Sequence, residues 1–512
     1  MRWDAMRSFD MSMPRMMLSG RAAHEVAADL LVLPVAAGDG GPLAPPVTRA
    51  VLERAGADLA ALGRHGRLGG ELDQTLLLPT FGRVGAPALL LVGVGRDSGR
   101  TLETMRRAAA VAVGAAGRAA SVATALPLCS CDATPGRPAG AAEVLAAVAE
   151  GFGLAAYRFE RHKSSAEPGL AEVTLLVDGA QATRAMLPAL RRAEVGVRAT
   201  SYARDLINEP AGSLSPADLA AEAARLAEVT LLECAVVEGE ALERGRFGAV
   251  LAVGGGSAVP PRLVTVRHRP AGARAHIALV GKGVTFDTGG LDLKRGASME
   301  GMKDDMAGAA TVLAVLGATA ELGLPVAVTG LLPLVENMPS GSAMRPGDVI
   351  RARNGTTIEV HDTDAEGRLS LADALALAAE DEPDAIVDVA TLTGSAVAGL
   401  GPHCSAVLSN TPALASRVLA AAASAGETAW ELPLVEDYRP FLDSDVADLR
   451  NATEHPGDVI QAALFLREFV AGRPWVHLDI AGPATLKEAH YHQPKGATGC
   501  MVRTLLRLLE GW

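Results

Sequence analysis

The sequence is poor in aromatic residues, cysteine and positive charge. Aromatic side chains make up 3% of the 512 residues, and the formal net charge is −12. An acidic chain repels phosphate backbones over long range unless a local basic patch reverses the field, so nucleic acid is only a secondary hypothesis as a partner. The chain has five cysteines, which is an uneven number and a small one for this length. This predicts reduced thiols and not a disulfide framework.

Long uninterrupted apolar runs are also missing. No stretch reaches the ~20 apolar residues of a membrane span without a charge, a proline or a glycine-rich break. The N-terminal segment MRWDAMRSFDMSMPRMMLSG carries charges throughout and lacks the apolar centre of a signal peptide. We expect residues 1–20 or so to be disordered, and we predict a cytoplasmic protein with no membrane partner.

Apolar residues are nevertheless abundant, at 49% of the chain, which is enough for more than one core. From about Glu25 to Leu187, short apolar runs alternate with Ala-rich stretches such as Thr104 to Ala120, a pattern that predicts a βαβ-type domain. A second alternating series follows a helix expected near Leu187 to Ile207. We therefore predict an α/β protein with a smaller N-terminal domain (residues 1–190) and a larger C-terminal domain (residues 191–512). The C-terminal sheet is expected to be mostly parallel or mixed and covered by helices on both faces.

Charged residues of the second series follow strand-like runs or begin predicted helices, the places where doubly wound sheets form ligand crevices. The segment IALVGKGVTFDTGG leaves an apolar strand, passes Lys282 between two glycines and reaches Asp287. The segment GMKDDMAGAATVLAVL places Asp305 at the start of an apolar helix, expected from about Met302 to Leu322. These segments predict a cluster of charges at one edge of the sheet.

Acids at alternate positions mark a third segment, VHDTDAEGRLSLADAL, which contains Asp362, Asp364 and Glu366. In an extended loop this spacing points all three side chains the same way. Two carboxylates ~4 Å apart repel by about 4 kcal/mol at an effective dielectric of 20, so four or five converging acids require cations between them. Oxygen ligands suit Mn²⁺, Mg²⁺ or Zn²⁺. Taken singly, each acid has a simpler explanation, because Asp and Glu commonly complement a helix N-terminus.

Three sequence blocks together resemble the leucyl aminopeptidase (cytosol aminopeptidase) family. They are VGKGVTFDTGG with Lys294 and MKDDM, then ENMPSGSAMRPGDVI, then TDAEGRLSLADAL followed by DVATLTG and HLDIAG. The blocks cover most of the C-terminal half, and TDAEGRL is highly specific. The N-terminal half is similar only in its alternating pattern and in ARDLINEPAGSLSP. The resemblance implies a metal-dependent aminopeptidase that releases N-terminal residues, with Leu, Met or similar apolar side chains preferred.

Carried over position by position, the resemblance implies a tighter metal site of Lys282, Asp287, Asp305 and Glu366, and a more exchangeable site of Asp287, Asp364 and Glu366. The two cations are expected to be Mn²⁺ or Zn²⁺, with Mg²⁺ or Co²⁺ as alternatives. They would activate a water molecule for attack on the peptide carbonyl. Ligation by Lys282 requires its free amine and hence a strongly lowered pKa, which burial and adjacent dications both favour.

The resemblance also implies roles for residues that are not metal ligands. Protonated Lys294 stabilises the developing oxyanion, and Arg368 holds a bicarbonate ion that acts as general base. Met302, Thr391 and Gly394 match positions that line the pocket for the substrate's first side chain, although apolar packing explains Met302 equally well. The expected partners are peptides with a free N-terminus, and the expected assembly is a homohexamer.

Two departures distinguish this chain from the family pattern. Asp362 stands where the family usually has Asn, and this added carboxylate is expected to tighten metal binding, attract the substrate amine or pair with a neighbouring cation. We include it among the substrate-binding candidates and hypothesise that it shifts the metal preference or the pH optimum. Asp458 and Val459 stand in a stretch, HPGDVIQAALFL, that is glycine- and alanine-rich in the family.

Two other classes of function stay open on the sequence alone. A phosphoesterase uses the same two-metal chemistry, although GKG lacks the full G-x-x-x-x-G-K-[ST] pattern of a phosphate loop. A DNA-binding regulator on a peptidase scaffold is opposed by the acidic charge, although a hexamer would concentrate scattered arginines in a groove. Hydrolysis of an aminoacyl anilide against a phenyl phosphate tests the first, and salt-dependent retention on duplex DNA tests the second.

Overall fold

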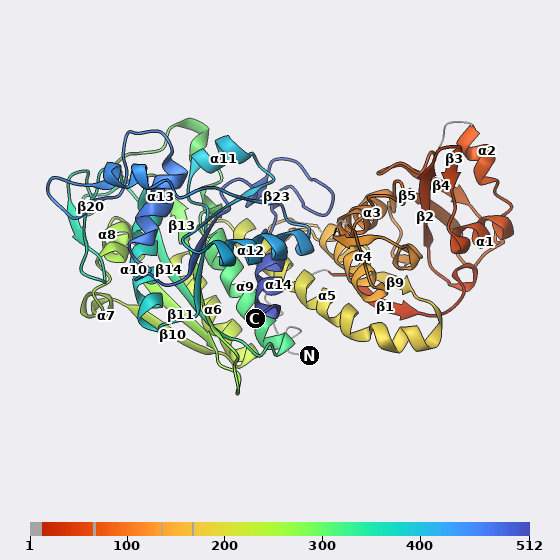
Figure 1. Ribbon diagram of the computed structural model, residues 1–512, viewed down its shortest axis with the longest axis horizontal. Helices are drawn as coiled ribbons and strands as arrows, with labels where there is room; N and C mark the ends of the chain where they lie inside the picture. Colours follow the sequence, from red (N-terminus) through yellow and green to blue (C-terminus); the bar gives the residue numbers. More distant parts are fainter. Residues whose placement is uncertain (1–12, 65–67, 135, 166–167) are drawn as a thin grey trace. The chain divides into compact units, whose positions relative to one another are not determined.

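The computed structural model describes residues 13–64, 68–134, 136–165 and 168–512 (Figure 1). These residues form two compact units. One contains residues 13–201 with Glu488–Lys495, and the other contains Tyr202–Lys487 with Gly496–Trp512. The boundary between the units lies within one long helix, α5 (Gly179–Asn208), and the boundary predicted after residue 190 lies within the same helix.

A mostly parallel sheet forms the centre of the N-terminal unit. Its strands lie side by side in the order β1 (Arg15–Ser19), β9 (Glu172–Leu176), β6 (Ser121–Thr124), β2 (Leu30–Gly38), β5 (Ala88–Gly93) and β4 (Thr75–Pro79). The edge strand β4 is antiparallel to its neighbour, as is the short β3 (Gly41–Leu43), which pairs with β2. The remaining two strands form a separate hairpin of β7 (Asp132–Thr134) and β8 (Arg137–Pro138).

Helices complete the N-terminal unit. The two largest that lie wholly within it, α3 (Leu102–Ala115) and α4 (Ala141–Ala155), pack against each other and share an apolar core with the sheet. Smaller helices are α1 (Pro46–Ala55) and α2 (Leu59–Arg64), with 3-10 turns at Ala23–Glu25 and Leu126–Leu128. This arrangement is the predicted βαβ-type domain.

The expectation of a disordered N-terminal segment needs a correction. Residues 1–12 lie outside the described residues. Residues Arg15–Ser19 form β1, which pairs with β9 in parallel along its whole length. The partner strand is far away in the sequence, so local composition gave no sign of it.

A larger mixed sheet forms the centre of the C-terminal unit. Its order is β10 (Glu233–Glu238), β11 (Arg262–His268), β14 (Ala327–Asn337), β12 (His276–Gly281), β17 (Ala385–Ala390), β21 (Trp475–Asp479), β18 (Ser405–Ser409) and β19 (Ala429–Glu431). A further strand, β13 (Gly283–Asp287), pairs with β14. The strands β14, β12, β17 and β21 are parallel, and β13 is parallel to β14, so their carboxyl ends share one edge.

The central strands are buried on both faces. The residues of β17 and β21 are all buried, and strands of this kind belong to sheets with helices on either side. One apolar core joins α10 (Glu366–Glu380) to α8 (Gly248–Gly254) and α13 (Asp458–Arg467). A second group, α9 (Ala307–Leu322), α6 (Pro216–Thr230) and α14 (Val502–Glu510), packs together, with α9 against β12, β14 and β17 (Figure 1). The predicted two-domain α/β fold with helix-covered sheets is thereby confirmed.

Helix α9 is apolar nearly all the way round. The segment Gly296–Leu322 is long and apolar enough to cross a membrane, but 83% of its most apolar window is buried inside the fold. It is therefore the core helix of this unit. The predicted start near Met302 was too early, because Met302–Asp304 forms a 3-10 turn before α9.

Apart from α12 (Pro412–Ala425), the other elements of the C-terminal unit are short. The remaining α-helices are α7 (Glu240–Arg244) and α11 (Gly394–Leu400), and 3-10 turns lie at Gly296–Ser298 and Glu436–Leu442. Two small sheets are β15 (Val349–Arg351), β16 (Thr357–Glu359) and β20 (Leu449–Arg450), and β22 (Thr485–Leu486) with β23 (Gly496–Ala497). Cys129, Cys131, Cys234, Cys404 and Cys500 are all free, as predicted.

Candidate metal centre

Polar residues gather where the parallel strands of the C-terminal sheet end. Lys282 follows β12, Asp287 ends β13, Asn337 ends β14 and Thr391 follows β17. Because these strands run in the same direction, their last residues lie at one edge of the sheet, which is where α/β proteins form ligand sites.

Two helix starts bring further acids to this edge. Glu366 is the first residue of α10, and Asp305 lies two residues before α9. The N-terminal end of a helix favours a negative charge, so each acid is stabilised locally as well as by its partners across the site. Helix complementation alone does not explain why acids from separate segments converge.

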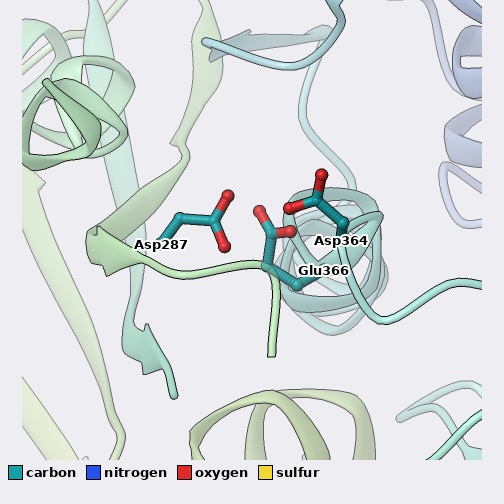
Figure 2. A group of neighbouring side chains, drawn as sticks. All are labelled: Asp287, Asp364 and Glu366. Carbon is teal, nitrogen blue, oxygen red and sulfur yellow. The ribbon is translucent and has the colours of Figure 1, made fainter. Parts of the chain in front are cut away.

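Three carboxylates form a tight group (Figure 2). Oxygen atoms of Asp287, Asp364 and Glu366 all lie within 4.8 Å of one another, and Figure 2 shows the three side chains pointing toward a common space. Asp287 and Glu366 are buried, at 2% and 1% exposure, whereas Asp364 is exposed. The group is therefore open to solvent on the side of Asp364.

Lys282 joins this group to Asp305. Its Nζ lies 2.7 Å from Asp305 Oδ1 and 3.0 Å from Glu366 Oε1, and it donates to the carbonyl of Thr391 at 3.0 Å. A Cβ at Gly367 would lie only 2.7 Å from this Nζ, so a side chain at position 367 would push Lys282 out of its present place. The structure thus brings Lys282, Asp305 and Glu366 into direct contact.

Lys294 holds the other side of the group. Its Nζ lies 2.7 Å from Asp287 Oδ2 and 2.6 Å from Asp364 Oδ1. The side chain is mostly buried, at 14% exposure. Two lysines and four carboxylates therefore lie in one network, which leaves two negative charges in excess.

The acids hold their protons more tightly than usual. Burial raises the pKa of Glu366 to about 7, and the charge of Asp287 adds to this rise. Burial likewise raises the pKa of Asp305. Removal of these acids from water, together with their mutual repulsion, makes the ionised cluster costly without added positive charge.

Lys282 does not have the lowered pKa that a free amine requires. Burial acts to lower the pKa of Lys282, but the charges of Asp305, Glu366 and Asp287 outweigh burial and raise it. Protein groups alone therefore favour the ammonium form. The lowered pKa that ligation requires depends on bound dications, which would repel the proton and neutralise the acids.

The donor set fits divalent cations. Asp305 Oδ2 and Glu366 Oε2 are buried, and each is without a hydrogen-bond partner within the described part of the chain. Buried carboxylate oxygens of this kind are normally satisfied by donors or by metal ions. Together with the excess negative charge, they match the oxygen-rich ligand sets of Mn²⁺, Mg²⁺ and Zn²⁺.

Two asparagines that the sequence did not single out hold this arrangement in place. Asn337 donates from its amide to Asp287 Oδ1 at 2.9 Å. Asn451 accepts from the backbone N–H of His361 at 2.7 Å and donates to the carbonyls of Asp362 and Ala365 at 2.6 and 3.2 Å. Both are buried amides. Asn337 stands in the block ENMPSGSAMRPGDVI that resembles the family, which was an available signal, whereas Asn451 lies in none of the matched blocks.

Arg368 lies two residues after Glu366, in the first turn of α10. It is 4% exposed, and its Nη1 donates to the carbonyl of Asn451 at 2.9 Å. Its Nη2 lies 2.8 Å from Asp458 Oδ1. The predicted anion-binding arginine therefore has an ion-pair partner within the chain.

The predicted substrate residues lie around this cluster. Thr391 donates from Oγ1 to Asp305 Oδ1 at 2.8 Å, and Met302 is half-buried in the turn before α9. Gly394 is exposed at the start of α11, and a Cβ built on it would have open space around it. Asp362 accepts a hydrogen bond from the backbone N–H of Asp364 at 2.8 Å, so it supports the loop that carries a candidate ligand.

Comparisons with known proteins agree on one family. Residues 201–506 match the sequence model of the "Cytosol aminopeptidase family, catalytic domain", and residues 32–166 match that of the "Cytosol aminopeptidase family, N-terminal domain". A Micrococcus luteus protein named "Probable cytosol aminopeptidase" is 44% identical over 98% of this chain and 99% of its own length. A Streptomyces coelicolor protein of the same name is 43% identical over 97% of this chain and 98% of its own length. The solved structure of the bottromycin maturation enzyme BotP in complex with Mn has a TM-score of 0.84 and 41% identity, over 95% of this chain and 99% of that one.

Proposed function

The chain belongs to the cytosol aminopeptidase family and is a metallo-aminopeptidase; from this premise we propose that it releases apolar N-terminal residues from peptides with a water molecule activated by two divalent cations. The observation that carries the proposal is the convergence of buried acids from three separate segments. Two of these acids, Asp305 and Glu366, each have a carboxylate oxygen without a hydrogen-bond partner among the described residues. Such a cluster favours the binding of added positive charge.

We propose Lys282, Asp287, Asp305 and Glu366 as ligands of one cation, and Asp287, Asp364 and Glu366 as ligands of the other. The contacts of Lys282 with Asp305 and Glu366 support the first set, and the 4.8 Å group supports the second. Mn²⁺ or Zn²⁺ is favoured, with Mg²⁺ or Co²⁺ as alternatives. The Mn in the related BotP structure supports Mn²⁺.

When bound, a pair of divalent cations polarises the scissile carbonyl and lowers the pKa of water toward neutrality. Lys294 is the chain's own donor to the developing oxyanion. Burial acts to lower its pKa, but Asp287 and Asp364 outweigh burial and raise it, which keeps the ammonium protonated at neutral pH. Since cations would take over these carboxylates, the ammonium would be released toward the substrate.

We propose that recognition of a free N-terminus depends on the unprotonated α-amine of the substrate, which would bind a cation in place of water, whereas an acylated N-terminus would not. The exposed side of the cluster at Asp364, with Asp362 beside it, is where this amine would enter. We propose Met302, Thr391 and Gly394 as the boundary of the first side-chain pocket. Met302 favours Leu, Met or similar apolar residues at this position.

Arg368 was predicted to hold a bicarbonate ion, and the residues around it do not suit this ion well. Its Nη2 is already paired with Asp458, as described above. We therefore derive no catalytic step from bicarbonate.

The assembly and the location are also proposals. We propose a homohexamer from the family resemblance, and light scattering that finds a monomer at micromolar concentration would reject it. The cytosolic location is proposed from the names of the relatives and from the burial of α9 in the fold.

The function is tested by hydrolysis of a leucine anilide. Chelator-treated protein is expected to be inactive and to regain activity with Mn²⁺, while an N-acetylated leucine anilide and a phenyl phosphate are left intact. Asp364→Asn and Glu366→Gln variants should stay inactive with Mn²⁺. Hydrolysis of the phosphate in preference to the anilide, or turnover that survives removal of metal, would refute the proposal.

A further inference from the structure

Asp458 places a carboxylate on the guanidinium group of Arg368. The contact joins Arg368 Nη2 to Asp458 Oδ1 at 2.8 Å. The Arg368 side chain is 5% exposed, whereas that of Asp458 is 43% exposed. The Asp458 carboxylate therefore covers the solvent side of a buried cation.

The charge of Arg368 has to be balanced inside the fold. An arginine stays protonated in proteins, and a buried cation requires an anion close by. Asp458 is the first residue of α13, so the helix N-terminus also favours its carboxylate. Asp458 is thus held in place from two sides.

This pairing disfavours the binding of a second anion to Arg368. A planar anion binds a guanidinium through two adjacent N–H groups, either Nη1 with Nη2 or Nε with Nη2. Both edges contain Nη2, and Asp458 accepts from one of its two N–H groups, while Asn451 accepts from one N–H of Nη1. Nε is buried and has no hydrogen-bond partner among the described residues, so the edge formed by Nε and Nη2 keeps open donors. A carbonate anion on that edge would lie beside the Asp458 carboxylate and be repelled.

The pair is connected to the loop that carries the candidate ligands. Arg368 donates to the carbonyl of Asn451, and the amide of Asn451 donates to the carbonyls of Asp362 and Ala365. A movement of Arg368 would therefore also move Asp362 and Ala365, which lie on either side of Asp364 in the sequence. Loss of the Asp458 charge would loosen this chain of contacts.

We infer that Asp458 is the resident anion of Arg368, a positioning residue for the cluster, and that this enzyme works without an added carbonate anion. The inference rests on the proposed function. It predicts that removal of the Asp458 carboxylate creates a dependence on bicarbonate that the unaltered enzyme lacks.

The test compares the full-length, Mn²⁺-loaded enzyme with Asp458→Gly in CO₂-free buffer, with sodium bicarbonate or sodium chloride added at equal ionic strength. Leucine anilide turnover of the unaltered enzyme should not respond to bicarbonate. Asp458→Gly should lose about tenfold or more, as supporting residues of metal sites typically do, and bicarbonate but not chloride should restore most of the loss. Asp458→Glu should retain activity without bicarbonate.

A second readout does not depend on turnover. Bicarbonate that binds the folded protein raises its thermal unfolding midpoint by mass action. The midpoint of Asp458→Gly should rise with bicarbonate, and that of the unaltered enzyme should not. Glu468→Gln is the matched control, because it removes a partly exposed carboxylate from Arg439, 2.7 Å away, and should leave the bicarbonate response of both readouts unchanged.

Two results would overturn the inference: an unaltered enzyme whose turnover rises several-fold with bicarbonate, or a folded Asp458→Gly that keeps full activity without responding. If Asp458→Gly does not fold, Asp458→Asn is measured in the same way. An unaltered enzyme that hydrolyses no anilide with Mn²⁺ present would refute the proposed function instead, and the thermal readout would then decide the role of Asp458.

Discussion

The side-chain amide of Asn337 donates a hydrogen bond to the carboxylate of Asp287 at 2.9 Å. Both side chains are buried, at 1% and 2% exposure. The same amide donates to the carbonyl of Thr363 at 3.0 Å. Asn337 therefore links the end of β13 to the loop that precedes Asp364, and so fixes the distance between two candidate ligands.

Replacement of Asn337 by Ala should weaken metal binding. Residues that orient metal ligands typically contribute about 10- to 100-fold in metal affinity, and we expect a loss of this size for Mn²⁺ measured by titration calorimetry. Asn354→Ala is the control, because Asn354 is exposed and only supports a turn through the N–H of Thr356. An affinity equal to that of the unaltered enzyme would exclude the supporting role.

Replacement of Lys294 by Met should separate catalysis from metal binding. Loss of one preorganised oxyanion donor costs about 100- to 1000-fold in kcat. Mn²⁺ affinity should be unchanged or higher, because the ammonium contacts Asp287 and Asp364 and so competes with a cation for them. Kinetics and calorimetry on the same preparation check both. A parallel loss of Mn²⁺ binding would show that Lys294 only maintains the structure.

Metal affinity should fall as the pH falls below about 7. The raised pKa of Glu366, from 4.5 to about 7, means that a proton must leave before a cation binds there. Each pH unit below this pKa then costs up to about tenfold in affinity, which calorimetric titrations at a series of pH values would measure. Affinity that is constant from pH 8 to pH 5, as an approximate range, would contradict this assignment.

The metal-free protein should show the opposite trend in stability. Glu366 binds its proton more tightly in the folded than in the unfolded state, so its contribution is present below pH 4.5 and is lost as the pH rises through about 7. Thermal unfolding of chelator-treated protein should therefore show this loss in the unaltered chain. It should be reduced in Glu366→Gln, which has no proton to lose.

Replacement of Asp362 by Asn should move the acidic limb of the activity profile to lower pH. Burial raises the pKa of Asp364, and the charges of Asp287 and Asp362 add to the rise. An Asn side chain still accepts from the Asp364 N–H but carries no charge, so Asp364 ionises more easily. Unchanged metal affinity together with an unchanged pH profile would remove any functional role for the Asp362 charge.

The central features of the fold could be predicted from the sequence because its central strands are nearly continuous apolar runs that alternate with helical stretches. The apolar runs that became β12, β17 and β21 needed no knowledge of distant partners. β1 and the start of α9 could not be placed in this way. Arg15–Ser19 is stabilised by β9 far along the chain, and the turn at Met302–Asp304 delays the helix.

The acids of the site were also visible in the sequence, because motif spacing brings each to a strand end or helix start. Their supports were harder to identify. Asn337 stands in a matched block but was not singled out within it, and nothing in the residues around Asn451 marks it. Asp458 was noticed only as a departure from a family pattern, and its contact with Arg368 joins segments about 90 residues apart.

The central claim is that two cations bind among the converging acids, and anomalous X-ray scattering from crystals of the Mn²⁺-loaded protein tests it most directly. The account predicts two anomalous peaks in each chain, one beside Lys282 and Asp305 and one beside Asp364, with Asp287 and Glu366 contacting both. Crystals without a peak among these carboxylates, from protein that nevertheless hydrolyses leucine anilide, would contradict it.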